Sequence, residues 1–60
     1  MTERIKALME EHGVNQVQLA EISGVSQSFI CNMLKGYKTP SVAVLKRIAE
    51  YFHVTVDELL

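Results

Sequence analysis

Cysteine is nearly absent from this 60-residue chain, which carries only Cys31 and therefore forms no internal disulfide. Its two histidines, His12 and His53, stand apart from any cysteine or acidic cluster at metal-ligand spacing, which argues against a metal site. No apolar run approaches the roughly 20 residues of a membrane span, and the charged opening segment lacks the apolar centre of a signal peptide. These absences predict a cytoplasmic protein without metal, cofactor or membrane contact.

The residue arrangements that catalysis needs are also missing. The expected helices bring together no paired carboxylates, Ser-His-Asp set or Cys-His set, and there is no glycine-rich phosphate loop. A chain this short buries one modest core and leaves little room for a ligand pocket of usual size. We therefore expect neither an enzyme nor a small-molecule substrate.

Acidic residues are missing from one long stretch, although the net charge is −1. Between Ile22 and Ala49 there is no Asp or Glu, and all seven acidic residues flank this stretch. Its basic residues are Lys35, Lys38, Lys46 and Arg47. A basic segment between acidic ends can orient a small domain on phosphates, but an ordinary solvated surface can show the same clustering.

Glycines and capping residues divide the chain into five short helices. We expect Thr2 to cap the first helix and Gly13 to end it. Asn15 is expected to cap the second helix, with Gln18 completing a capping box, and Gly24 to end it.

The second half of the chain contains similar signals for helix starts and helix ends. Ser26 is expected to cap a third helix from Gln27 to about Lys35, which Gly36 stops. Thr39-Pro40 is expected to start the fourth helix, because proline suits the first helical position. His53 lies past its end, and Thr55 caps a last turn. Strand signals are weak, so the fold class is all-α.

Apolar residues at helical spacing form the expected core. They are Ile5, Leu8, Met9, Leu19, Ala20, Val25, Ile30, Met33, Leu34, Val42, Leu45, Ile48, Ala49, Phe52, Val54, Val56 and Leu59.

The segment from Gln16 to Lys35 is typical of two helices that cross through a tight turn. Ala20 lets the backbones approach, Gly24 accepts the positive φ of the turn, and Val25 locks the angle from the core. In such pairs the second helix stands out from the domain and fits the major groove of DNA.

On these residues the chain resembles the lambda-repressor/Cro-like (XRE-type) helix-turn-helix family. The motifs are Leu-Ala-x-x-x-Gly-Val-Ser from Leu19, Gly-x-x-x-Pro-Ser from Gly36 and Val-x-Val-Asp-Glu-Leu-Leu from Val54. The resemblance implies a single compact five-helix DNA-binding domain over residues 1–60, with the helix-turn-helix at helices 2 and 3. It further implies a sequence-specific regulator of transcription, a repressor, that binds double-stranded DNA.

The resemblance also assigns roles. Gln27 corresponds to the base reader, with Ser28 beside it and Asn32 one turn on, and amide side chains can bond bidentately to adenine. Residues of this type near a helix start are often ordinary caps, but Ser26 already occupies the cap. Phosphate contacts would come from Gln16 at the start of the second helix and from Lys35, Tyr37 and Lys38 in the loop after the third helix.

Other residues leave alternatives open. Phe29 either touches the DNA or packs against the domain, and Cys31 is a small packing or groove-facing residue. Lys46 and Arg47 are expected on the solvated side of the fourth helix. Among departures from the family pattern, Met9, Glu10 and Glu11 stand where relatives commonly carry Arg or Lys, and Val17 and Ile22 are expected to be exposed apolar residues.

Relatives bind pseudo-palindromic operators as dimers, which implies a homodimer at least on DNA. Leu59, Leu60 and the end of the fourth helix are candidates for the self-association surface. Two other functions fit the same fold. One is an antitoxin-type regulator that binds an operator and a toxin, and the other is a protein–protein module, consistent with the acidic first helix.

Overall fold

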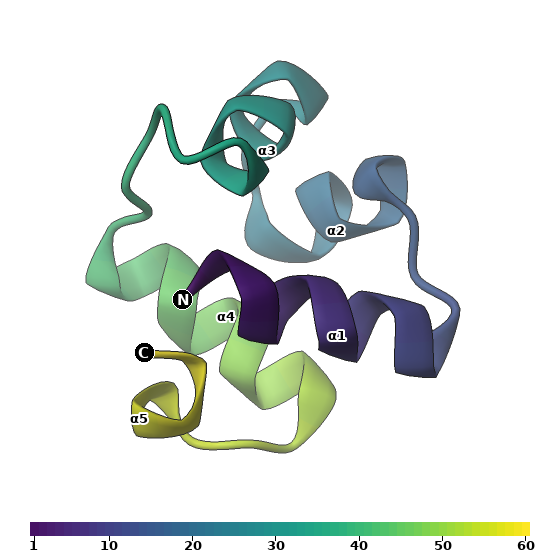
Figure 1. Cartoon of the computed structure of the whole chain (residues 1–60), viewed down its shortest axis with the longest axis vertical. Coiled ribbons are helices and arrows are strands. Elements are labelled where there is room, and N and C mark those ends of the chain that lie inside the picture. Colours follow the sequence, from purple (N-terminus) through teal and green to yellow (C-terminus); the bar gives the residue numbers. More distant parts are fainter.

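The computed structural model describes all residues, 1–60, as five α-helices joined by short turns (Figure 1). They are α1 (Thr2–His12), α2 (Gln16–Ser23), α3 (Gln27–Leu34), α4 (Val42–Phe52) and α5 (Val56–Leu59). The chain contains no strand, which confirms the expected all-α fold. None of the five helices combines the length and apolar character that crossing a bilayer requires.

Four helix ends share one hydrogen-bond pattern, the Schellman motif. A residue in the left-handed conformation follows each of α1 to α4, namely Gly13, Gly24, Gly36 and His53. The N–H of the next residue then donates to a carbonyl five residues back, in the pairs Val14–Met9, Val25–Ala20, Tyr37–Asn32 and Val54–Ala49. The expected helix ends are therefore confirmed, including the unusual one at His53.

Side-chain caps start four of the helices. Asn15, Ser26, Ser41 and Thr55 each accept a hydrogen bond from the backbone N–H three residues later. The expected caps Asn15, Ser26 and Thr55 are therefore confirmed. Ser41 is a further cap, which the sequence analysis did not name.

Two expected helix starts are wrong. The N-cap of α1 is Met1, whose carbonyl accepts the Ile5 N–H at 3.2 Å, so Thr2 already lies inside the helix and caps nothing. Pro40 is buried before the start of α4, and the Oγ of Ser41 takes the cap by accepting the Val44 N–H at 3.3 Å. Val42 is the first residue of α4 and is 64% exposed, and Val44 instead belongs to the buried stripe of this helix.

The core is a single cluster of 15 buried apolar residues drawn from all five helices and the turn after α1. Its fully buried members are Ile5, Leu19, Ile30, Met33, Ile48 and Leu59. Helix α2 packs against α3 and α4, while α1 packs against α3 and α5.

Some residues lie deeper or shallower than expected. Val25, Val54 and Val56 are half-buried against the core, whereas Ile22, expected on the surface, also packs against it. Complete burial of Leu59 excludes it from any self-association surface.

Candidate nucleic-acid interface

The turn between α2 and α3 is held by backbone hydrogen bonds and by the cap of α3. Gly24 has φ 72°, and the N–H groups of Gly24 and Val25 both donate to the carbonyl of Ala20, at 2.9 and 3.1 Å. Ser26 then starts α3 by accepting the Phe29 N–H at 3.0 Å. These contacts fix where α3 begins relative to α2, and they involve the residues that the sequence indicated for the turn.

Helix α3 has one buried side and one accessible side. Ile30, Met33 and Leu34 are buried in the core. Gln27 and Ser28 are exposed at the N-terminal end of the helix. The structure therefore leaves the first turn of α3 free to touch a partner.

Further along α3, the side chains are less accessible. Asn32 and Cys31 lie one turn beyond Gln27 and Ser28 and are half-buried. Phe29 is also half-buried and packs against the core, which favours its packing role over a contact with DNA.

The loop after α3 projects an aromatic residue between basic ones. Tyr37 follows Gly36 in the Schellman motif, where Val14, Val25 and Val54 follow the other helix ends and are buried or half-buried. Tyr37 is instead 76% exposed, and Lys35 and Lys38 are exposed beside it in the sequence. The loop thus presents one phenol and two ammonium groups to solvent.

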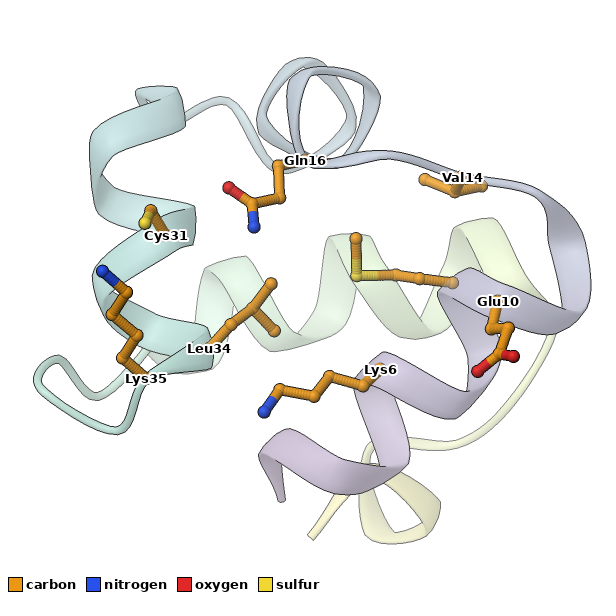
Figure 2. Close-up of a pocket in the computed structure, with 8 residues that line it drawn as sticks. Lys6, Glu10, Val14, Gln16, Cys31, Leu34 and Lys35 are labelled. Carbon is orange, nitrogen blue, oxygen red and sulfur yellow. The ribbon is translucent and has the colours of Figure 1, made fainter.

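Gln16 is the first residue of α2, and a reciprocal capping box fixes its position. Asn15 Oδ1 accepts the Gln18 N–H at 2.8 Å, and Gln18 Oε1 accepts the Asn15 N–H at 2.9 Å. Gln16 lies on an open groove of about 470 Å³ that Cys31 and Lys35 also line (Figure 2). The structure thus brings Gln16 together with α3 and Lys35.

The presence of this groove corrects one expectation. The short chain was predicted to lack room for a ligand pocket of usual size, yet the volume falls within the range of such pockets. Its lining residues come from α1 and the turn after it, from the start of α2 and from the C-terminal end of α3.

Two basic residues have neighbours that the sequence did not predict. Arg47 is exposed on α4 as expected, and its guanidinium lies beside the Cβ position of Gly24. Lys6 of α1 lines the same groove as Gln16. Both placements depend on how helices distant in sequence pack, so no local pattern signals them.

Comparison with known proteins places the chain in a family. A sequence profile described as "Helix-turn-helix" matches residues 5–59. The chain is also 31% identical, over 58 residues, to the immunity repressor protein of Bacillus phage phi105. That match covers 97% of this chain and 40% of the phage protein, so the chain spans less than half the length of this relative. No solved structure matched the chain.

The profile match covers nearly the whole chain, including all of α2, α3 and the turn between them. The motifs that carry the resemblance lie at the caps, turns and buried positions of the fold described above. The chain belongs to the lambda-repressor/Cro-like (XRE-type) family of helix-turn-helix DNA-binding regulators.

Proposed function

We propose that residues 1–60 form a single cytoplasmic DNA-binding domain of a transcriptional repressor that reads the major groove of duplex DNA with α3. The observation that carries this proposal is the exposed first turn of α3, where Gln27 and Ser28 follow directly on the fixed turn at Gly24. The likeness to a phage immunity repressor supports regulation by repression.

Within this interface the side chains divide into two groups. Gln27, Ser28 and Asn32 contact base edges, because amide and hydroxyl groups match the donors and acceptors of the major groove. Gln16, Lys35, Tyr37 and Lys38 contact phosphates and set the register of the domain on the duplex. The absence of acidic residues from Ile22 to Ala49 keeps like-charge repulsion low across α3 and its loop.

Two copies bind one pseudo-palindromic operator. A single module buries only about 600–1,000 Å² of protein surface on DNA, which is little for tight specific binding. Half-sites one helical turn apart, about 34 Å, place two α3 helices in successive major grooves. Leu60 is 69% exposed and Tyr51 48% exposed, so the C-terminal side of the domain offers apolar surface for the second copy.

A salt titration against random duplex tests DNA binding itself. Counterion release predicts that affinity falls steeply as salt rises, by a slope of about −0.9 per phosphate contact. A protein–protein module on the same fold would show almost no affinity for duplex even at low salt.

Paired substitutions test the division of roles. On a preferred site selected from a random duplex pool, Gln27→Ala should lose about 1–3 kcal/mol of binding free energy with little change on random DNA. Lys38→Ala should weaken binding to both duplexes about equally. Equal behaviour of the two variants would contradict the assignment.

A further inference from the structure

An open groove lies where α1, α2 and α3 meet, next to the proposed DNA interface (Figure 2). Its volume, about 470 Å³, lies within the range of pockets that hold small organic molecules. Such a pocket, with an apolar lining and a few polar groups, is the usual place for a ligand in a protein. The groove is therefore the candidate ligand site of this domain.

The apolar lining of the groove is the edge of the hydrophobic core. Met9, Val14 and Leu34 belong to the core cluster and line the groove, and each keeps 8% of its surface exposed. The core members Ile5 and Ile30, by contrast, are completely buried. Covering apolar surface that still contacts water is favourable, so this lining is suited to the hydrocarbon part of a ligand.

The charges around the groove are unequal. Lys6 and Lys35 contribute two ammonium groups, and Glu10 contributes the only carboxylate. Figure 2 shows Lys6 extending toward the side of the groove that holds Leu34 and Lys35, whereas Glu10 points away from that side. Neither ammonium group takes part in a side-chain hydrogen bond, since those bonds belong to the capping residues of α2 to α5. The α3 side of the groove is thus positive, and one ammonium group is enough to hold a carboxylate.

An apolar lining with a positive side selects one class of ligand. A neutral hydrocarbon would leave the ammonium groups without a partner, and a small inorganic anion would leave the apolar lining in contact with water. An organic cation would face two like charges. A small molecule with a carboxylate at one end and an apolar body matches both features.

We propose that this groove binds a small amphipathic carboxylate, and that the bound ligand excludes duplex DNA. The carboxylate lies on the side of Lys6 and Lys35, and the apolar body covers Val14 and Leu34. The exclusion of DNA rests on the proposed function. Gln16 and Lys35 line the groove and are also proposed phosphate contacts, so a ligand beside them occupies space that the DNA backbone needs. Such a ligand acts as an inducer that releases the repressor.

Octanoate is the probe for binding, with acetate and octylamine as its controls. Acetate has the same charge without the apolar body, and octylamine has the apolar body with the opposite charge. In an NMR titration without DNA, octanoate should shift the methyl signals of Val14 and Leu34 to saturation, whereas the two controls should not. Octanoate should also slow alkylation of Cys31, the only cysteine, which lines the groove. Equal shifts with octylamine, or octanoate shifts confined to residues outside the groove, would overturn the proposal.

A matched pair of variants, Lys6→Glu and Lys46→Glu, tests the charge selection. Both are exposed lysines inside 11-residue helices, but Lys46 lies on α4 and does not line the groove. Lys6→Glu should weaken octanoate binding about three- to tenfold, because repulsion replaces attraction. Lys46→Glu should leave it unchanged, and both variants should melt within a few degrees of the parent protein. Unchanged binding in Lys6→Glu, or equal weakening in both, would contradict a charge-selective groove.

Competition with DNA is measured on the parent protein with a random duplex. Octanoate at its own dissociation constant should about double the apparent dissociation constant for the duplex. Sodium acetate at the same concentration is the control, because it gives the same ionic strength. Groove binding without any effect on duplex affinity would overturn the inducer role. If the parent protein bound no duplex at all, the proposed function would fail, while the titration without DNA would still decide whether the groove binds a carboxylate.

Discussion

The guanidinium of Arg47 occupies the space beside Gly24 that a side chain on that residue would need. A Cβ atom built on Gly24 would contact Arg47 Nη1 and lie 3.5 Å from its Cζ. The side chain of Arg47 therefore reaches from α4 to the turn between α2 and α3. Position 24 is constrained by its φ of 72°, whereas the guanidinium is the far end of a flexible, exposed side chain and can shift aside.

Substitution of Gly24 by Ala tests the effects of the positive φ and of Arg47, with the same substitution at Gly13 as the control. Gly13 has a similar φ, 67°, but nothing lies within 4 Å of its Cβ position. Gly13→Ala should therefore lose only the cost of a left-handed non-glycine residue, about 1–2 kcal/mol of unfolding free energy. Gly24→Ala should lose a similar amount, because the exposed Arg47 side chain can move aside at little cost. Urea denaturation of both variants gives the difference.

The contribution of Arg47 to the stability cost of Gly24→Ala can be measured in the same experiment. In an Arg47→Ala background, the cost of Gly24→Ala should change little, because the flexible Arg47 side chain can already move aside in the parent protein. A clear drop in that cost without Arg47 would show that Arg47 does obstruct a side chain at position 24.

His53 ends α4 in the left-handed conformation, with φ 58°. Because glycine adopts this conformation without a Cβ clash, His53→Gly should raise the unfolding free energy by about 0.5–1 kcal/mol. The same change at Lys46, inside α4, should lower it by about 1 kcal/mol. Thermal melts that showed a loss at both positions would contradict the helix end described here.

The two predicted N-caps of α1 and α2 differ in the structure. Asn15 makes a capping box with Gln18, whereas Thr2 makes no side-chain cap. Asn15→Ala should therefore cost about 0.5–2 kcal/mol, while Thr2→Ala should cost almost nothing. Chemical denaturation distinguishes them, and equal losses would mean that Thr2 does cap α1.

Ser23 has a buried hydroxyl without a hydrogen-bond partner. Ser23→Ala should leave the unfolding free energy unchanged or raise it by up to about 1 kcal/mol, since an unpaired buried hydroxyl is removed. Ser41→Ala is the control, because it deletes the cap of α4 and should cost about 1 kcal/mol. A clear loss of stability from Ser23→Ala would indicate a hydrogen bond to that hydroxyl.

Local interactions explain why most of the fold could be predicted from the sequence. The ends of α2 depend on Asn15, Gln18 and Gly24, which interact within a few residues of one another. The start of α4 was harder to predict because Pro40 and Ser41 are competing start signals in adjacent positions. In the folded domain Pro40 is buried and Ser41 caps the helix.

The candidate site also has features that the sequence predicts and features that it does not. Ser28 lies opposite the buried Ile30 and Met33 on the helix, so the sequence predicts its exposure, whereas Gln27 is three residues before Ile30 and is exposed in the first turn of α3. The positions of Arg47 and Lys6 depend on how α4 and α1 pack against distant segments. Spacing within one helix carries no information about such contacts.

The most direct test of DNA reading by α3 is an NMR titration of the protein with a duplex selected for binding. Backbone and side-chain amide shifts should change at the proposed contacts, namely Gln16, Gln27, Ser28, Asn32, Lys35, Tyr37 and Lys38. Signals of Tyr51 and Leu60 would respond only if the two copies touch. Binding that left Gln27, Ser28 and Asn32 unperturbed would contradict DNA reading by α3.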